Sequence, residues 1–498
     1  MSRRIAISLE GWAALLFALA RTGVCAYRAA TQSVVHDEAL TYVGYVSGPW
    51  SNVYAPYFSN NHILFTILSR LSIRVLGLSE FSFRLASIIA GFLLILGIYR
   101  VLQQAAISVP IRWAALLAVG LHPLLLDFSV AARGYSLALA CLIWALVFSM
   151  RGRDVAAGLL LGLGLSANLV VAHLALGLLL SRFALSGEAI PKSAKGAART
   201  TNVTSNSFAP HSVLRVLLGR LRALLSAGAC MVLVFVAICW GVVRSMVPAN
   251  FATVGLPSLQ SSLDSVVMTS IRATVNHGLF GTIEAARFIE DVMIPAVMIL
   301  VAFAGILMWR AGELGHTRFL PAATLGLACA GMVAGHYLVH LNYPTDRTGL
   351  PFVVLAGIAW AIAVGEFKNS WVTCINMVLA TALLVQFLTQ FDTSAFQIWR
   401  YDRSTKQIVQ RLAEECSGRE PGSVRVSATW FQQPALEFYR IYKKVAALQP
   451  VERIDRTRLS GFDYYVLNAP DTATPEVRQM EVLFSDPLAG VILARERR

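Results

Sequence analysis

The sequence predicts a polytopic α-helical membrane protein of about eleven transmembrane helices, followed by a small soluble α/β domain. Of the 498 residues, 56% are hydrophobic and only 14% are charged, whereas a soluble domain carries about 25% charged residues. So few charges cannot solvate a globule of this size. Most of the chain must therefore face lipid or other helices.

The membrane part is predicted from apolar runs of about 20 residues, the length that crosses a bilayer. These runs recur along the first four fifths of the chain, and the fifth and sixth form one long stretch that Asn168 and His173 interrupt. The spans are predicted at 9–29, 81–102, 112–130, 134–150, 154–171, 172–187, 223–243, 291–309, 319–339, 348–365 and 371–391.

The charged residues separate two domains. Residues 401–498 hold 28 of the 70 charged side chains. This shift predicts a transmembrane domain over residues 1–395 and a soluble domain over residues 396–498. Helix and strand patterns alternate in the second domain, which indicates an α/β fold. The helices are predicted at 404–416, 433–444 and 475–484, and the strands at 423–428, 464–468 and around Val491.

The net charge of +14 does not indicate nucleic acid binding. The basic residues cluster in short loops between apolar runs, as the positive-inside rule requires, and the rule places the N-terminus in the cytoplasm. Segments 30–80, 244–290 and 340–347 then lie outside, together with the soluble domain. The seven cysteines form no CxxC pair, so neither a zinc site nor a disulfide framework is indicated.

The first outer segment is too apolar for a plain loop. Apolar residues recur at helical spacing between Asn61 and Leu76, with Arg70 and Arg74 between them. This pattern predicts a helix that lies along the bilayer surface.

Two neighbouring carboxyl groups, Asp37 and Glu38, follow the first span. Crowding two carboxylates together at a membrane surface is unfavourable, so the pair is a candidate general base or metal site. The alternative is an acidic helix N-terminus or a solvated loop. His62 is a further candidate at the head of the interfacial helix, where the segment 60–62 could equally act as a helix cap.

Three arginines are predicted at the outer surface, although the positive-inside rule gathers arginines on the other side. Arg133 precedes Tyr135 at the start of the fourth span, Arg347 lies in the short loop 342–347, and Arg21 lies late in the first span. A planar guanidinium binds phosphate bidentately, so these residues suit an anionic lipid head group. The alternatives are that Arg133 pairs with Asp127 and that Arg21 is a snorkelling side chain.

The order of these motifs resembles the GT-C superfamily of polyprenyl-phosphate-sugar-dependent membrane glycosyltransferases, most of all the bacterial relatives of protein O-mannosyltransferases and aminoarabinose transferases (family 39-like). There, an Asp-Glu pair follows the first span, a His lies near the second interfacial helix, and an Ala-Arg-x-Tyr element opens the fourth span. The matching residues here are Asp37-Glu38, His62 and Ala132-Arg133-Gly134-Tyr135. A late Pro-x-x-Arg-Tyr element is matched at Pro344–Arg347, except that Thr348 replaces the Tyr.

The resemblance implies an inverting sugar transfer in which Asp37 is the base. It implies that Arg133 and Arg347, with Arg21 third, stabilise the leaving lipid phosphate. Glu38 and His62 would position the acceptor or a divalent metal ion, whose involvement stays open because some relatives use one and others do not. Tyr135 and Asp127 complete the expected substrate-binding set. No other cofactor is expected.

The implied partners are a polyprenyl-phosphate-linked sugar donor, a lipid, glycan or protein acceptor, and membrane lipids, without nucleic acid. The implied location is the bacterial inner membrane, with the soluble domain in the periplasm. One alternative is a transporter or flippase of a lipid-linked saccharide, but such proteins commonly contain internal repeats, which the sequence lacks. A second alternative is another lipid-phosphate-dependent transferase, such as a phosphoethanolamine transferase or an O-antigen ligase. The former would need a metal-binding soluble domain rich in His and Asp, and residues 396–498 contain no His.

Overall fold

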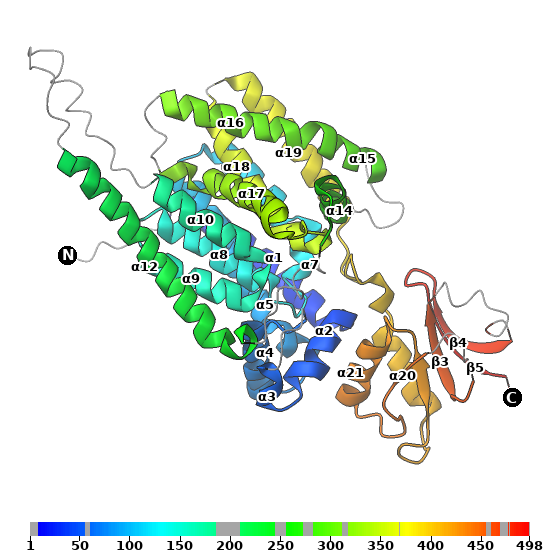
Figure 1. The fold of residues 1–498 in the computed structure, drawn as a ribbon. Helices are drawn as coiled ribbons and strands as arrows, with labels where there is room; N and C mark the ends of the chain where they lie inside the picture. The colour runs from blue at the N-terminus through cyan, green and yellow to red at the C-terminus, as the bar shows by residue number, and fades with distance from the viewer. Residues whose placement is uncertain are drawn as a thin grey trace, which may run out of the picture. The chain divides into compact units, whose positions relative to one another are not determined.

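The computed structural model describes residues 8–54, 60–185, 210–244, 255–271, 282–310, 317–367, 369–454, 460–468, 477 and 479–497. The chain forms two compact units, and each is built from three separate segments (Figure 1). Unit 1 comprises Met1–Arg21, Ala90–Leu126 and Gly134–Phe391. Unit 2 comprises Thr22–Ile89, Asp127–Arg133 and Asp392–Arg498.

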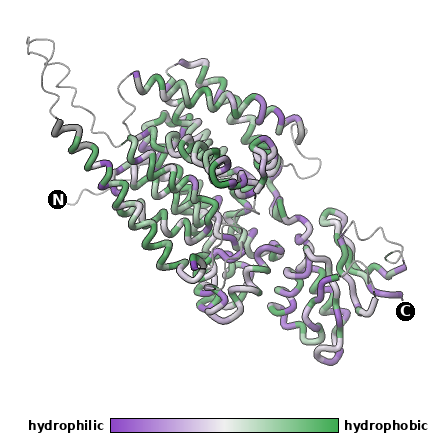
Figure 2. The backbone as a smooth tube through the Cα atoms, in the orientation of Figure 1, coloured by the Kyte–Doolittle hydropathy of each residue, from purple (hydrophilic) through white to green (hydrophobic). Residues whose placement is uncertain are grey.

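The polytopic helical prediction is confirmed. Within the described residues, seven helical segments are long and apolar enough to cross a membrane, and four shorter ones are also apolar. Each corresponds to one predicted span, and Figure 2 shows their hydrophobic character in green. The long segments contain α1 (Leu9–Thr31), α5 (Glu80–Gln104), α12 (Pro210–Val243), α16 (Ile294–Arg310), α17 (Leu320–Val339), α18 (Leu350–Glu366) and α19 (Ser370–Thr389). The shorter ones are α6 (Val109–Gly120), α8 (Tyr135–Ser149), α9 (Asp154–Ala167) and α10 (Ala172–Leu185) with the 3-10 turn before it.

Two of the predicted spans differ in detail. The run 112–130 is split into α6 and α7 (Pro123–Phe128), because Pro123 has no N–H to continue the first helix and suits the start of a new one. Between α9 and α10 the side chain of Asn168 accepts a hydrogen bond of 3.1 Å from the backbone N–H of Val170. This contact starts the short 3-10 turn Leu169–Val171 and ends the preceding helix.

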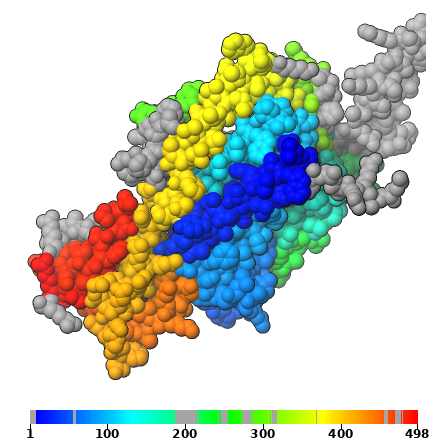
Figure 3. Space-filling model, turned by 180° about the vertical axis from the view of Figure 1, so that it is seen from behind, coloured from blue at the N-terminus to red at the C-terminus, as the bar shows by residue number. Residues whose placement is uncertain are grey.

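Small residues let the helices of unit 1 pack closely. α9 lies beside α12, and α10 lies beside α17 (Figure 1). A Cβ placed on Gly162 would lie 2.6 Å from Val234 Cβ, and one on Gly177 would lie 2.6 Å from the carbonyl oxygen of Thr324. Glycines at such contacts are typical of helix packing within membranes. α1 instead keeps one side exposed, as the blue helix in Figure 3 shows, and this side carries exposed apolar residues such as Leu9, Leu16 and Leu19.

Unit 2 contains a five-stranded sheet of order β2-β1-β3-β5-β4. The first three strands are parallel, and β5 runs antiparallel to both of its neighbours. Two amphipathic helices, α20 (Thr405–Glu415) and α21 (Gln433–Lys443), accompany the sheet. The strands are β1 (Val426–Ala428), β2 (Glu452–Arg453), β3 (Tyr464–Asn468), β4 (Met480–Asp486) and β5 (Val491–Glu496).

The C-terminal sheet shares one hydrophobic core with the first outer segment. This core includes Phe438 and Tyr439 of α21 together with Tyr42, Phe65 and Phe83 from the N-terminal part of the chain. The helices of that segment are α2 (His36–Thr41), α3 (Trp50–Val53) and α4 (Ile63–Leu76). The domain boundary after residue 395 stays a prediction, and the compact unit that holds the sheet begins its last segment at Asp392.

One helix of the soluble domain is predicted wrongly. Residues 480–484 belong to strand β4, whereas most of the preceding residues 475–479 lie outside the described part of the chain. β4 pairs with β5 from Met480 to Asp486, and this antiparallel ladder supplies the backbone hydrogen bonds that a helix would otherwise make. Gly490, with φ of 64°, occupies the tight turn between the strands. The hairpin pairing therefore overrides local helix propensity.

The predicted interfacial helix exists as α4. Its exposed side carries Leu71, Val75 and Leu76, while Phe65 and Ser69 are fully buried. Its position along a membrane surface stays a prediction.

Candidate active site

The two predicted carboxylates lie in the first turn of the short helix α2, in unit 2. Both are buried, with 7% of Asp37 and 0% of Glu38 exposed. An acidic first turn suits the positive end of a helix. Glu38 also accepts a hydrogen bond of 2.9 Å from the backbone N–H of Val35, which caps the helix.

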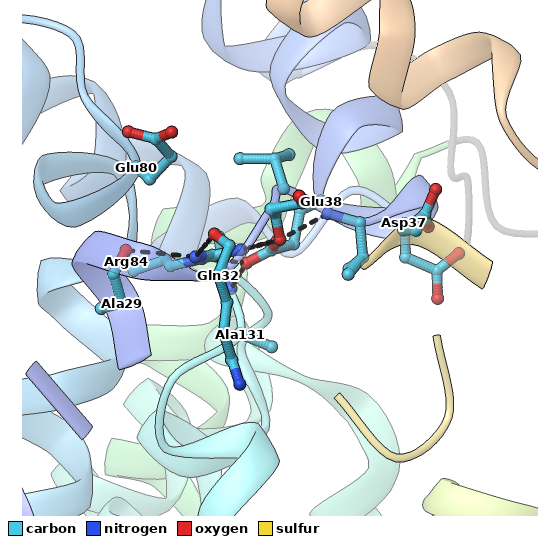
Figure 4. A network of polar contacts seen from close by, with 12 residues as sticks. Ala29, Gln32, Asp37, Glu38, Glu80, Arg84 and Ala131 are labelled. Carbon is cyan, nitrogen blue, oxygen red and sulfur yellow. Dashed lines mark hydrogen bonds and ion pairs between the residues drawn. The ribbon is translucent and has the colours of Figure 1, made fainter. Parts of the chain in front are cut away.

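Glu38 forms a buried ion pair with Arg84 of α5. The guanidinium nitrogens Nε and Nη2 lie 2.8 Å and 2.5 Å from the two carboxylate oxygens, and both side chains are 0% exposed. Figure 4 shows the pair at the centre of a polar network. The remaining donors of Arg84 contact the carbonyl oxygens of Ala29 at 3.1 Å, Gln32 at 2.8 Å and Ser33 at 2.8 Å.

The same carboxylate also holds the segment before α8. The backbone N–H of Ala132 donates to Glu38 Oε1 at 2.5 Å, and the Ser87 hydroxyl donates to the carbonyl of Ala131 at 2.6 Å. Glu38 is thereby joined to α2, to α5 and to the residue next to Arg133. Its contacts therefore reach three separate segments of unit 2.

Asp37 points away from the Glu38–Arg84 pair (Figure 4). Its carboxylate oxygen Oδ2 lies 4.0 Å from Nη2 of Arg133. Nη1 of Arg133 lies 3.4 Å from the carbonyl oxygen of Asp37 and 3.4 Å from the hydroxyl of Thr41. The structure therefore brings together three of the predicted residues, and it gives the two adjacent acids different surroundings.

His36 precedes Asp37 and is also buried, with 3% exposed. Its backbone N–H donates to Asp402 Oδ2 at 2.6 Å, and its ring Nδ1 lies 2.9 Å from the carbonyl oxygen of Phe431. Burial lowers the pKa of His36 and raises the pKa of Asp402 well above its usual range. The imidazole is therefore neutral near neutral pH, and its Nδ1 carries the proton because a carbonyl can only accept.

Asp127 belongs to a second buried ion pair in unit 2. Its Oδ1 lies 2.5 Å from Nη2 of Arg28, and its Oδ2 accepts a hydrogen bond of 2.6 Å from the backbone N–H of Gln397. Arg28 also donates to the carbonyl of Ala395 at 3.2 Å. The ion-pair partner of Asp127 is thus Arg28, and the arrangement fastens the end of α1 to residues 395–397.

His62 is buried at the N-terminus of α4, next to Asn61, whose side chain donates to the carbonyl of Val53 at 2.9 Å. The other predicted residues belong to unit 1. Arg21 donates to the carbonyl oxygens at the ends of neighbouring helices, Gly120 at 2.6 Å and Leu125 at 3.3 Å. Tyr135 is buried at the start of α8, and Arg347 is half-buried in the 3-10 turn Asp346–Gly349.

The described ranges contain no cluster of three or more His, Cys, Asp or Glu side chains that could hold a metal ion. Of the two side chains considered for this role, Glu38 already has both oxygens engaged by Arg84 and by backbone N–H groups. With these contacts in place, the Glu38 carboxylate does not fit a metal ligand.

Two ion-pair partners were missed in the sequence. Arg84 and Arg28 both interrupt predicted apolar spans, and an ionisable residue within a span is a signal in its own right. The sequence does not reveal which acids they pair with, because the partners lie 46 and 99 residues away.

No protein family and no curated protein matches the chain by sequence. The structure is similar to that of ArnT from Cupriavidus metallidurans in the apo state, with a TM-score of 0.50, 14% identity and coverage of 97% of this chain and 98% of ArnT. ArnT bound to undecaprenyl phosphate gives a TM-score of 0.48 at 13% identity, covering 98% of both chains. The arabinofuranosyltransferase AftD from Mycobacteria gives 0.46 at 13% identity, covering 99% of this chain and 40% of AftD.

Proposed function

On the premise that this integral membrane protein has the GT-C fold of ArnT, we propose that it is a glycosyltransferase that moves a sugar from a polyprenyl-phosphate donor to an acceptor. The observation that carries the proposal is the buried Asp37 carboxylate beside the Arg133 guanidinium, 4.0 Å apart on a fixed backbone. Undecaprenyl phosphate is the lipid found bound to ArnT, and an anionic phosphate suits the guanidinium of Arg133.

Asp37 is the proposed base. The acceptor hydroxyl or amine gives its proton to the carboxylate while its lone pair forms a bond to the anomeric carbon. The anomeric carbon–oxygen bond breaks at the same time, and its electron pair leaves with the polyprenyl phosphate. Attack from the face opposite the leaving group inverts the anomeric configuration.

Arg133 is the proposed cation for the leaving phosphate. A guanidinium placed where negative charge develops lowers the barrier to departure. Its contact with Asp37 is long for an ion pair, so a phosphate oxygen can take over this contact when the donor binds. The carboxylate is then released to accept a proton.

Glu38 is proposed to hold Asp37 and Arg133 in place rather than to contact the substrate. Its bonds to Arg84 and to Ala132 fix both neighbours in the chain, Asp37 on α2 and Arg133 before α8. A carboxylate with both oxygens occupied is a poor proton acceptor. We therefore assign proton transfer to Asp37 and the positioning of Asp37 and Arg133 to Glu38.

The roles of the remaining residues are proposed from the resemblance. Arg347 binds the donor phosphate, with Arg21 as a third candidate, and His62 and Tyr135 contact substrates. The pairing of Asp127 with Arg28 favours a structural role for that acid. The distribution of Lys and Arg supports an inner-membrane protein with a cytoplasmic N-terminus and a periplasmic C-terminal soluble domain.

The test is turnover by the full-length protein in nanodiscs with a panel of undecaprenyl-phosphate-linked hexoses, pentoses and aminosugars. Released polyprenyl phosphate is measured by chromatography, and the product anomer by NMR. We expect release with one class of donor and an inverted anomer. Arg133→Ala should raise the donor KM, whereas Arg425→Ala, at an exposed position in the same unit, should not. Retention of configuration, or equal effects of the two variants, would contradict the proposal.

A further inference from the structure

A pair of exposed aromatic side chains lies on the turn between β1 and α21. Trp430 is 50% exposed and Phe431 is 42% exposed. The turn is firmly held, because the backbone N–H of Gln432 donates to the carbonyl of Thr429 at 3.1 Å and its side chain donates to the carbonyl of Tyr401 at 2.7 Å. Large aromatic side chains kept exposed on a rigid turn are typical of a binding surface.

The turn occupies the part of the sheet where α/β proteins bind ligands. β1 is parallel to β2 on one side and to β3 on the other, so the strand order reverses between β1 and β3. Residues Thr429 and Asn468 follow the carboxyl ends of these strands, and their side-chain oxygens lie 3.3 Å apart. In open sheets, ligands bind outside the carboxyl ends of the strands at such a switch point.

The aromatic turn adjoins α2, which packs beside α21 in unit 2 (Figure 1). The His36 ring lies against Trp430 with centroids 4.4 Å apart and against Phe431 at 6.3 Å. Arg453 belongs to strand β2, and its guanidinium lies 5.9 Å from the centroid of the Trp430 ring. An aromatic face, an imidazole and a guanidinium therefore meet one residue from the proposed base.

His36 presents a buried acceptor without a donor. Its Nδ1 faces the carbonyl of Phe431, whereas its Nε2 is sealed from solvent and has no hydrogen-bond partner among the described residues. A neutral imidazole with the proton on Nδ1 has a lone pair on Nε2. A buried acceptor of this kind is unfavourable unless a hydroxyl or amine donates to it.

We infer that Trp430, His36 and Arg453 form the subsite for the acceptor, and that the acceptor group bound there is a sugar. A pyranose offers a C–H face that packs on Trp430, hydroxyl donors for His36 Nε2 and oxygen acceptors for Arg453. A lipid chain offers no donor. Access of the hydroxyl to the buried Nε2 requires a side chain packed on His36 to move, and the half-exposed Trp430, 4.4 Å away, is the candidate. This inference rests on the proposed function only in calling the sugar an acceptor.

The test is saturation-transfer NMR on the full-length protein in nanodiscs, with methyl glycosides of hexoses and pentoses as probes and dihexanoyl phosphatidylglycerol as a lipid control. We expect at least one glycoside to bind through protons of one ring face. Trp430→Ala should weaken this binding about tenfold. His36→Asn should also weaken it, because its amide can still donate to Phe431 but cannot replace Nε2. The matched control is Trp50→Ala, since Trp50 is 53% exposed in the same unit, and it should bind as the wild type does.

Three results would overturn the inference: no glycoside binds, the lipid alone binds in a Trp430-dependent way, or Trp50→Ala weakens binding as much as Trp430→Ala. The assay does not require turnover. Glycoside binding that depends on Trp430 in a protein that consumes no polyprenyl-phosphate sugar would refute the proposed function and leave the subsite intact.

Discussion

Replacing Glu38 by Gln tests whether the Glu38–Arg84 pair holds unit 2 together. The change keeps the shape of the side chain and removes its charge, so the fully buried guanidinium of Arg84 loses the carboxylate that lies 2.5 Å away. Its three carbonyl acceptors remain. Breaking a buried ion pair by removing one partner typically costs about 3–5 kcal/mol.

This magnitude translates into a large shift in melting temperature. Unit 2 contains about 180 residues, and an unfolding entropy of about 2.1 cal/mol/K per residue gives roughly 0.4 kcal/mol/K for such a unit. A loss of about 3–5 kcal/mol should therefore lower the apparent Tm by roughly 8–13 °C.

The assay is a thermal-shift measurement on purified protein in detergent, with Glu452→Gln as the matched control. Glu452 pairs with Arg425 at 3.1 Å, but both side chains are nearly half exposed, and such surface pairs contribute about 0–1 kcal/mol. A double variant, Glu38→Leu with Arg84→Met, should recover much of the lost stability because neither side chain is then left as an unpaired buried charge. If Glu38→Gln melts as Glu452→Gln does, the pair does not hold the unit.

Three further predictions concern other groups. Burial lowers the pKa of His36 below 6.5, so the folded state favours the neutral ring, and stability from this residue is lost as the pH falls below that value. Denaturation titrations at pH about 7.5 and about 5 should therefore show a larger drop in the free energy of unfolding for the wild type than for His36→Asn. Equal drops in the two proteins would contradict this prediction. Asp127→Asn leaves the buried guanidinium of Arg28 without its charged partner and should lower the free energy of unfolding by about 3–5 kcal/mol in the same assay. The control Asp463→Asn, at an exposed ion pair with Arg419, should change the free energy of unfolding little. Arg347→Lys keeps the charge but loses the bidentate fork, so the donor KM should rise about tenfold in steady-state kinetics, and an unchanged KM would exclude it as a phosphate ligand.

The helical part of the fold follows from the sequence because bilayer-spanning runs are read from local composition alone. Asn168 interrupts the long apolar run as predicted, whereas the break at Pro123 divides the predicted span 112–130. Strand β4 is different, since it depends on pairing with β5, and local propensity in residues 475–484 points to a helix. Pairing within the sheet, in which β5 joins β4 to β3, decides that region, and local propensity does not encode it.

In the candidate site, too, some features are predicted by the sequence and others depend on the folded chain. Asp37, Glu38 and Arg133 are identified by motif order, and the structure places them together. The partners of Glu38 and Asp127 depend on which buried arginine lies within reach, and only the folded chain decides between Arg84 and Arg28. The resemblance already assigns the base to Asp37 and a positioning role to Glu38, whereas the different burial and hydrogen bonding of the two acids are visible only in the folded chain.

The most direct test of the central claim is the turnover number of Asp37→Asn with the polyprenyl-phosphate sugar that the wild type consumes. The variant keeps the size of the side chain and removes the proton acceptor, so kcat should fall by about 10²–10⁴, with donor Kd and apparent Tm close to those of the wild type. A variant that turns over at the wild-type rate would contradict the assignment of Asp37 as the base.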